Sequence, residues 1–390
     1  MEKRKIPAVR FKGFEDDWEQ RKLGEVTQKF KSGKSLKADK ISESGAYPVY
    51  GGNGLRGYTS TYNHEGEFAL IGRQGALCGN MNYFIGKAYF TEHAVAVEAD
   101  ENNNTRFMYY MLDTMNLGQY SDQSAQPGLA VNKLIKLENM FPKKEEQIKI
   151  ENYFQSIDHL ITLHQRKLEK LQLVKKSMLE KMFPKNGSKI PEIRFEGFAD
   201  DWEQRKLNDV AKFSKGNGYS KGDLIEAGTP IILYGRLYTK YETTISDVDT
   251  FVVAKDGSVY SKGGEVIVPA SGETAEDIAR AATVDKPGIL LGGDLNVVMP
   301  NEEINSAFLA ISISNGSSQR ELAKKAQGKS VVHIHNEEIR NLVVPFPTKA
   351  EQNKIVDYFA NLDSLITLHQ RKLEKMKSFK KSLLEKLFVQ

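Results

Sequence analysis

Apolar residues recur in alternating steps of four and three along two separate stretches of the chain. The positions are Ile157, Ile161, His164, Leu168, Leu171, Lys175, Met178 and Met182 in the first stretch, and Leu362, Ile366, His369, Leu373, Met376, Lys380, Leu383 and Leu387 in the second. This spacing is typical of a coiled-coil seam. It predicts one helix from about residue 145 to 182, roughly 55 Å long, and a matching second helix. Because both carry the same stripe, we expect them to pair with each other, head to tail.

Short apolar segments separated by glycine-rich turns precede each predicted helix. They lie at 46–50, 67–72 and 93–98 in the first half, and at 231–234, 265–269 and 295–299 in the second. Such segments are typical of β-strands. We therefore predict an α+β fold in which two long helices form an antiparallel coiled coil. The predicted ranges are 1–144 and 192–347 for the β-rich regions, 145–183 and 348–390 for the helices, and 184–191 for a linker.

Two segments of the sequence occur twice. Residues 141–183 match 346–388 at 28 of 43 positions, and residues 9–26 match 193–210 at 13 of 18. The segments between them, 27–140 and 211–345, differ in composition and by 21 residues in length. The chain therefore resembles one frame built twice around two different inserts, and we expect internal pseudo-twofold symmetry.

Several single residues of the repeats invite an interpretation. Trp18 and Trp202 occupy the same place in both copies, and we expect them to anchor each half by packing, with base stacking as the alternative. Pro142 and Pro347 precede the helices, and the acidic residues after Pro142 suit the positive end of a helix. His164 and His369 fall on the seam, where a role in fixing the register is favoured over metal binding.

Composition places the chain among ordinary soluble globular proteins. It has 390 residues, 40% hydrophobic and 27% charged, with a net charge of +4. This mild basicity permits a nucleic-acid partner without requiring one. Cys78 is the only cysteine, which excludes an intrachain disulfide and a cysteine-based zinc site. No apolar run reaches the roughly 20 residues that span a bilayer, so we expect a cytoplasmic protein without a membrane partner.

Motifs for catalysis are missing. Residues 52–57 spell Gly-x-Gly-x-x-Gly, but the segment that follows has no helical period, so we interpret it as a turn-rich loop. Phosphate-loop, deaminase and nuclease patterns are incomplete, and no adenine-methyltransferase motif is present. We predict neither catalytic residues nor a metal site.

The whole chain resembles the specificity subunit of type I restriction-modification systems. The resemblance rests on Gly-Ala-Tyr-Pro-Val-Tyr-Gly-Gly-Asn-Gly at 45–54, on residues 57–59, 70–75 and 124–129, and on a proline followed by Glu-Gln at each helix start. The second half departs from this pattern at 228–236, so a different target is expected there. The resemblance implies that each β-rich region reads one half of a bipartite, asymmetric site in double-stranded DNA, while the helices set the spacer.

The resemblance also implies partner subunits. Two methyltransferase subunits would dock on the helices and use S-adenosylmethionine, and motor-nuclease restriction subunits would use ATP and magnesium. No cofactor is expected in this chain itself. The resemblance implies a non-catalytic role for this chain, in which its loops read the DNA sequence.

Side chains that can reach base edges or phosphates are the candidate DNA contacts. Arginine forms strong hydrogen bonds with guanine, and glutamine or asparagine forms them with adenine. Lysine more often contacts phosphate. The candidates are Lys34, Lys37, Asn53, Arg56, Tyr58, Arg73, Gln74 and Gln126 in the first half, and Lys215, Lys221, Arg236, Thr274, Gln327 and Lys329 in the second.

Two other functions stay open. A duplicated helical scaffold could bridge protein partners without reading DNA, although such a scaffold does not require two divergent inserts rich in Gly, Arg, Gln and Asn. A stand-alone nuclease is the third alternative, and the missing carboxylate grouping disfavours it.

Overall fold

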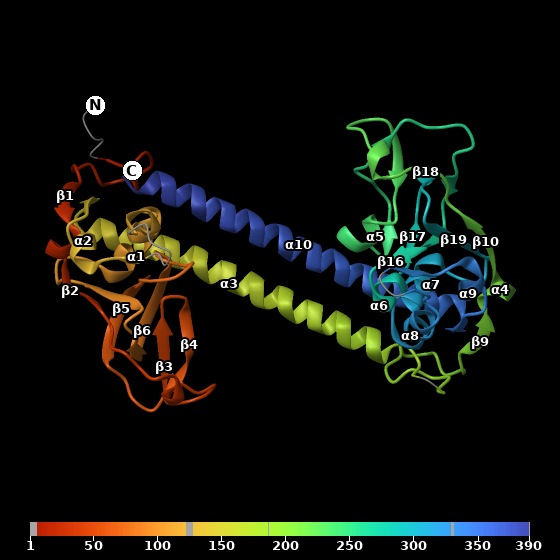
Figure 1. Ribbon diagram of the computed structural model, residues 1–390, viewed down its shortest axis with the longest axis horizontal. Coiled ribbons are helices and arrows are strands. Elements are labelled where there is room, and N and C mark those ends of the chain that lie inside the picture. The colour runs from red at the N-terminus through yellow and green to blue at the C-terminus, as the bar shows by residue number, and fades with distance from the viewer. Residues whose placement is uncertain (1–5, 122–127, 186, 329–330, 390) are drawn as a thin grey trace. The chain divides into compact units, whose positions relative to one another are not determined.

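The computed structural model describes residues 6–121, 128–185, 187–328 and 331–389 (Figure 1). The chain divides into two compact units. Unit 1 comprises residues 1–166 and 370–390, and unit 2 comprises residues 167–369. These borders differ from the predicted ranges, which end where the helices begin. They pass through the helices because the core of each unit includes parts of both long helices.

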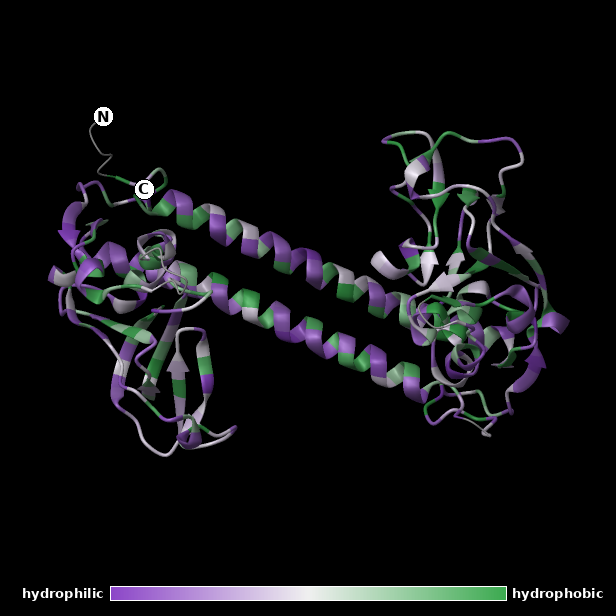
Figure 2. Cartoon of the chain, in the orientation of Figure 1, coloured by the Kyte–Doolittle hydropathy of each residue, from purple (hydrophilic) through white to green (hydrophobic). Residues whose placement is uncertain are grey.

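Two long helices are present where the sequence predicted them. Helix α3 spans Lys144–Lys181 and α10 spans Lys349–Leu387. At 1.5 Å per residue α3 is about 57 Å long. Figure 2 shows hydrophobic and hydrophilic residues alternating along both helices. Among the described helices, none is long and apolar enough to cross a membrane.

The helices run antiparallel within each unit. In unit 1, Lys380 Nζ of α10 lies 2.6 Å from Asp158 Oδ1 of α3. In unit 2, Lys175 of α3 pairs with Asp363 of α10. Asp363 is the duplicate of Asp158, and Lys380 is the duplicate of Lys175. The same antiparallel register therefore recurs in both units, and the predicted pairing is confirmed in each.

The seam residues lie on the paired faces. Ile157, Leu168, Leu171, Leu362 and Leu373 are buried. Four further positions, Ile161, Met178, Ile366 and Leu383, pack against the two cores while partly exposed. Met182 and Leu387 are also buried, whereas His164, His369, Met376, Lys175 and Lys380 are half-buried. Apolar contact thus stabilises the pairing of the helices in both units.

Unit 1 is built on a six-stranded sheet. Its strand order is β2-β7-β5-β6-β3-β4. The strands are β2 (Thr27–Ser32), β3 (Tyr47–Gly51), β4 (Gly54–Thr59), β5 (His64–Gly72), β6 (Met81–Phe90) and β7 (Ala94–Ala99). Strand β4 corrects the interpretation of 52–57 as a loop, because β3 and β4 form a hairpin across Gly51 and Gly54. Helices α1 (Thr105–Thr114) and α2 (Val131–Leu134) follow, and β1 (Glu19–Lys22) pairs with β8 (Glu138–Phe141).

Unit 2 has more and shorter strands. A five-stranded sheet contains β10 (Ala211–Lys215), β19 (Leu295–Pro300), β15 (Glu265–Pro269), β17 (Ala282–Val284) and β12 (Thr244–Ile245), and a four-stranded sheet contains β13 (Phe251–Val252), β11 (Thr229–Ile232), β18 (Pro287–Leu291) and β14 (Tyr260–Lys262). Two further pairs are β9 (Glu203–Lys206) with β21 (Val343–Phe346) and β16 (Ser271–Gly272) with β20 (Val332–His333). The shorter helices are α4 (Leu207–Val210), α5 (Arg236–Thr239), α6 (Ala275–Ile278), α7 (Ser306–Ile313), α8 (Gly316–Lys324) and α9 (Asn336–Arg340).

Each unit closes its core around a tryptophan, as predicted. Trp18 packs edge-on against Phe107 of α1, and Phe107 contacts Phe388 beyond the end of α10. Trp202 packs in the same way against Phe308 of α7, and Phe308 contacts Phe183 beyond the end of α3. Both indole rings are buried, so the packing role is confirmed.

A repeated ion pair holds the start of each long helix. Arg10 donates two hydrogen bonds of 2.7 Å to the carboxylate of Glu146, and Arg194 donates bonds of 2.7 and 2.8 Å to that of Glu351. Both glutamates are buried. The sequence had suggested only that Glu146 suits the helix dipole. Its main role here is to pair with an arginine from the segment that precedes the β-rich region.

Candidate nucleic-acid interface

Four segments of unit 1 meet in what we call the first loop cluster: residues 33–37, 50–53, 72–75 and 90–94. Backbone hydrogen bonds of 2.8–3.0 Å join them. The bonds run from Gly33 N to Ala94 O, Lys34 N to Phe90 O, Thr91 N to Tyr50 O, and Arg73 N to His93 O. Segments that are far apart in the sequence therefore form one connected surface.

Glycine makes this close packing possible. A Cβ atom at Gly33 would lie 2.0 Å from the Phe90 carbonyl oxygen, and one at Gly72 would lie 2.4 Å from that of Gly52. No larger residue fits at these contacts without moving the backbone. The glycines thus fix the loops against one another.

The first cluster presents the polar side chains that the sequence singled out. Lys34, Asn53 and Gln74 are exposed on it, and Arg73 is half-buried. Arg73 Nε donates to Leu129 O at 3.3 Å, which holds the start of the side chain in place.

Of the other candidates in unit 1, Lys37 lies in the cluster and Arg56 lies beside it. Arg56 is exposed, and its side chain passes close to Gly51. Lys37 is exposed at the start of the 3-10 helix Ala38–Lys40. Tyr58 lies further along β4, where its backbone bonds to Ser42, so the structure does not bring Tyr58 into the cluster.

Unit 2 repeats the same framework with different residues, which we call the second loop cluster: 215–218, 232–236, 270–272 and 291–295. The matching bonds run from Gly216 N to Leu295 O, Asn217 N to Leu291 O, Gly292 N to Ile232 O, and Ala270 N to Asp294 O, at 2.8–3.1 Å. The bond from Leu129 N to Arg73 O also recurs, from Ile334 N to Ala270 O. One backbone design therefore carries both clusters.

The side chains at matching positions of the two clusters differ in kind. The pairs are Lys34 and Asn217, Arg73 and Ala270, Gln74 and Ser271, and His93 and Asp294. Two cations and a carboxamide in the first cluster thus correspond to smaller polar or apolar residues in the second. The two surfaces offer different hydrogen-bond donors and acceptors.

The lysines of unit 2 lie at the edge of the second cluster. Lys215 and Lys221 are both exposed. Lys221 lines a hollow of about 790 Å³ together with Tyr219, Tyr234 and Arg236. This hollow is large enough to take a base or a sugar-phosphate group.

Arg236 is placed differently from the prediction. Its guanidinium is buried and bonds to Asp249 at 2.8 Å and Glu242 at 2.7 Å. Hydrogen bonds from Lys240, and also from Arg236, lower the pKa of Asp249 to about 2, so this carboxylate stays charged. The geometry therefore supports a structural ion pair, and it disfavours base reading by Arg236.

The other candidates of unit 2 have mixed placements. Thr274 caps α6, because its Oγ1 accepts from Asp277 N at 3.1 Å and donates to Asp277 Oδ2 at 2.7 Å. Gln327 is exposed, and its backbone bonds to His333 beside Ser271. Gln126 and Lys329 lie outside the described residues.

Sequence reasoning missed two histidines, His93 in the first cluster and His333 beside the second. His93 contacts Gln74, and His333 contacts Ser271. The candidates drawn from the sequence were arginine, lysine, glutamine, asparagine, tyrosine and threonine residues, and none was a histidine. The one feature of the sequence that could have indicated His93 is its position in a short polar loop between two strands, β6 and β7.

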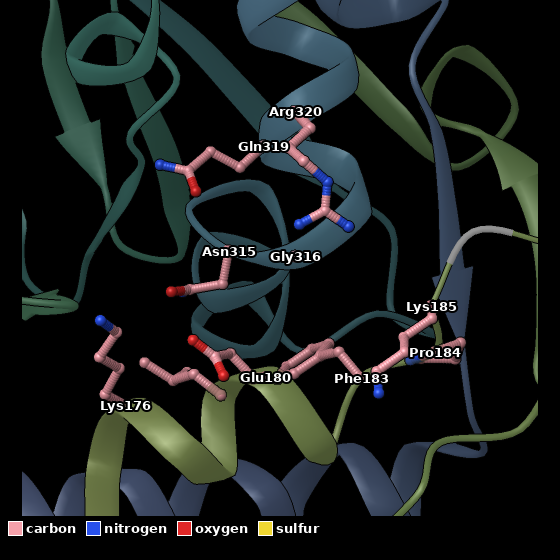
Figure 3. A pocket seen from close by; sticks show the side chains of 10 residues that line it. Lys176, Glu180, Phe183, Pro184, Lys185, Asn315, Gly316, Gln319 and Arg320 are labelled. Atoms are coloured by element: carbon pink, nitrogen blue, oxygen red, sulfur yellow. The ribbon is translucent and has the colours of Figure 1, made fainter. Parts of the chain in front are cut away.

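A further hollow, of about 460 Å³, lies in unit 2 between the end of α3 and the start of α8 (Figure 3). Arg320 on one wall points toward the space above Glu180, which stands on the other wall near Lys176. A carboxylate among the cations makes this a mixed-charge surface. Among the described residues, no group of three or more His, Cys, Asp or Glu could hold a metal ion.

Comparison with known proteins decides the family. The sequence profile described as "Type I restriction modification DNA specificity domain" matches residues 15–173 and again residues 199–378. The chain belongs to this family. Each specificity domain match contains one of the two loop clusters, and the family resemblance stated from the sequence is confirmed.

Individual relatives agree with this family assignment. The chain is 45% identical to the specificity subunit of the type I restriction enzyme EcoprrI of Escherichia coli over 154 residues, which is 38% of each chain. It is 23% identical to the MjaVIII specificity subunit of Methanocaldococcus jannaschii, over 96% of this chain and 92% of that one.

A solved structure shows the same fold. The crystal structure of the S subunit of a type I restriction-modification system from M. genitalium matches with a TM-score of 0.70 and 16% identity. The match covers 98% of this chain and 99% of that one. The α+β fold with two specificity domains is therefore the family's fold.

Proposed function

We propose that this chain is the DNA-specificity subunit of a type I restriction-modification complex and has no catalytic chemistry of its own. Unit 1 reads one half of a bipartite, asymmetric site in double-stranded DNA, and unit 2 reads the other half. One observation carries the proposal: the same backbone bonds hold two loop clusters whose side chains differ. The two clusters share a backbone framework but differ in their exposed side chains. This arrangement suits the reading of two different DNA sequences.

The side chains of the clusters suit this task. Sequence is read by donors and acceptors that reach base edges in the grooves, whereas phosphate contacts add affinity without sequence information. The first cluster offers Asn53, Arg73 and Gln74 for bases. Exposed lysines at 34, 37, 215 and 221 suit phosphates. Gln126 and Lys329 stay predictions.

The helices supply the second part of the proposal. Helices α3 and α10 repeat most of their sequence and their antiparallel ion pairs. Equal surfaces suit two equal partners, so two methyltransferase subunits dock on them and supply S-adenosylmethionine chemistry. Restriction subunits add ATP- and magnesium-dependent cleavage. The length of the helices sets the unread spacer.

A protein-bridging scaffold is the alternative, and the loop clusters argue against it. A scaffold would conserve its helices, as this chain does, but it has no use for two fixed polar surfaces of different composition. The paired helices alone would be enough to bridge two protein partners.

Methylome sequencing tests the proposal. A host that makes the partner methyltransferase is compared with and without this chain. We expect adenine methylation at one bipartite, asymmetric motif only when the chain is present. Methylation of the same motif in its absence would contradict the proposal, and a motif with a single uninterrupted part would contradict the two-domain reading.

A further inference from the structure

Gln74 of the first loop cluster is held by a histidine from a neighbouring segment. His93 Nδ1 lies 2.8 Å from Gln74 Oε1. On the other side of the ring, His93 Nε2 lies 3.6 Å from Glu92 Oε1. Glu92 in turn accepts a hydrogen bond of 3.3 Å from Ser35 Oγ. When Nδ1 donates to Gln74, Nε2 of the neutral ring has no proton for Glu92, so Glu92 pairs with His93 only when both ring nitrogens are protonated.

The chemistry of these groups fixes the direction of the contact. A carboxamide oxygen can only accept, so the ring nitrogen that faces it carries the proton. The carbonyl end of Gln74 is therefore turned toward His93, and its amide NH2 is turned away. Among the described residues, that NH2 has no hydrogen-bond partner.

We propose that His93 is a positioning residue that decides which end of the Gln74 amide meets the DNA. This inference rests on the proposed function, because it assigns a role within DNA reading. Without the ring, a glutamine amide can turn over and offer its donor and acceptor ends alternately. With the ring in place, it offers donors.

The fixed orientation predicts the kind of base group that is read. An amide NH2 donates to acceptors of the major groove, which are guanine O6 and N7, adenine N7 and thymine O4. Cytosine presents an amino donor there, and it is rejected because two donors would face each other. One position of the first half-site should therefore discriminate against cytosine.

The second cluster has a similar contact built from another element. Ser271, which matches Gln74, lies 3.4 Å from His333 Nδ1 on β20. The residue that matches His93 is Asp294, so this histidine comes from a different segment. The rings of His333 and His335 lie 6.4 Å apart and nearly parallel, at 9°. A histidine beside the residue that matches Gln74 therefore recurs in unit 2.

Paired variants in the full chain test this inference. The methylated motif is recovered by methylome sequencing, and base frequencies are compared position by position. His93→Ala should relax the preference at one position of the first half-site by about 2- to 12-fold, the factor that one neutral hydrogen bond contributes. His93→Gln keeps an N–H donor and should restore much of the preference. His333→Ala, the matched control, should affect only the second half-site.

Substituting Gln74 itself should reverse the base preference at this position. Gln74→Glu replaces the outward NH2 with an acceptor, so the preference at the same position should shift toward cytosine, whose amino group can donate to a carboxylate. This variant lies on the exposed surface and does not depend on how His93 variants fold. Melting curves of all variants show whether the fold is kept.

The outcomes separate the inference from the proposed function. If Gln74→Ala relaxes one letter while His93→Ala leaves every letter unchanged, the positioning role is wrong and the reading role stands. If Gln74→Glu leaves the preference unchanged, the inference is overturned. If the wild-type chain directs no bipartite motif at all, the proposed function itself fails.

Discussion

Replacing Glu146 by glutamine should destabilise unit 1 by about 2–4 kcal/mol. The carboxylate accepts two hydrogen bonds of 2.7 Å from Arg10 and is only 2% exposed. Glutamine keeps a single acceptor oxygen and loses the charge. A hydrogen bond to a charged group contributes about 1.5–3 kcal/mol, and a buried charge left without its partner costs 3–5 kcal/mol. Because the side chain of Arg10 is 14% exposed, water recovers part of that loss.

Urea unfolding measures this difference for unit 1 alone. Each unit contains one tryptophan, so a Trp202→Phe background leaves Trp18 as the reporter of unit 1. The control is Glu145→Gln, since this neighbouring glutamate is exposed and should change the free energy of unfolding by less than about 0.5 kcal/mol. Equal effects of the two substitutions would refute the assignment of the buried ion pair.

Three further predictions concern DNA reading, the helices and pH. Arg73→Ala should weaken binding to the first half-site by about 1–3 kcal/mol, and equal weakening on unrelated DNA would contradict base reading. Deleting residues 161–167 together with their duplicates 366–372 should shorten the helices by about 10 Å and the unread spacer by about three base pairs, with the same letters in each half; changed letters would contradict the spacer role. Burial lowers the pKa of His64 to about 4 from the ordinary 6.5, so the stability of unit 1 should be fully present above pH 6.5 and fall by about 2–3 kcal/mol as the pH drops to 4. Urea unfolding at a series of pH values should show this loss in the wild type and less of it in His64→Phe; parallel curves would rule out His64 as the cause.

The two long helices and six of the strands could be predicted because their patterns are local. The seam spacing placed α3 and α10 within a few residues of their ends, and short apolar segments between glycine-rich turns placed strands such as β5 and β15. Helix α7 was missed because all its residues from Ala307 to Ile313 are buried, so its sequence has no polar face to reveal a helical period. Strand β6 was missed because Gly86, with a φ of 118°, interrupts an otherwise strand-like run.

The candidate site could be predicted in residue type but not in arrangement. Arg73 and Gln74 are polar residues in a glycine-rich loop, which a sequence shows directly. The contact of Gln74 with His93, and that of Ser271 with His333 across 62 residues, depend on which loops meet in space. Arg236 was assigned to DNA from its residue type, but its partners Glu242 and Asp249 lie on either side of β12, and the sequence does not reveal that they meet it.

An exchange of inserts tests most directly that one duplicated frame presents two different reading surfaces. Residues 211–345 are replaced by a second copy of residues 27–140, since both inserts run from a conserved valine to a conserved phenylalanine of the repeats. The DNA motif of this chain is then recovered by methylome sequencing. The account predicts two inverted copies of the first half-site, because the helices that carry the inserts are antiparallel in each unit. A motif that keeps the original second half, or that repeats the first half in the same direction, would contradict it.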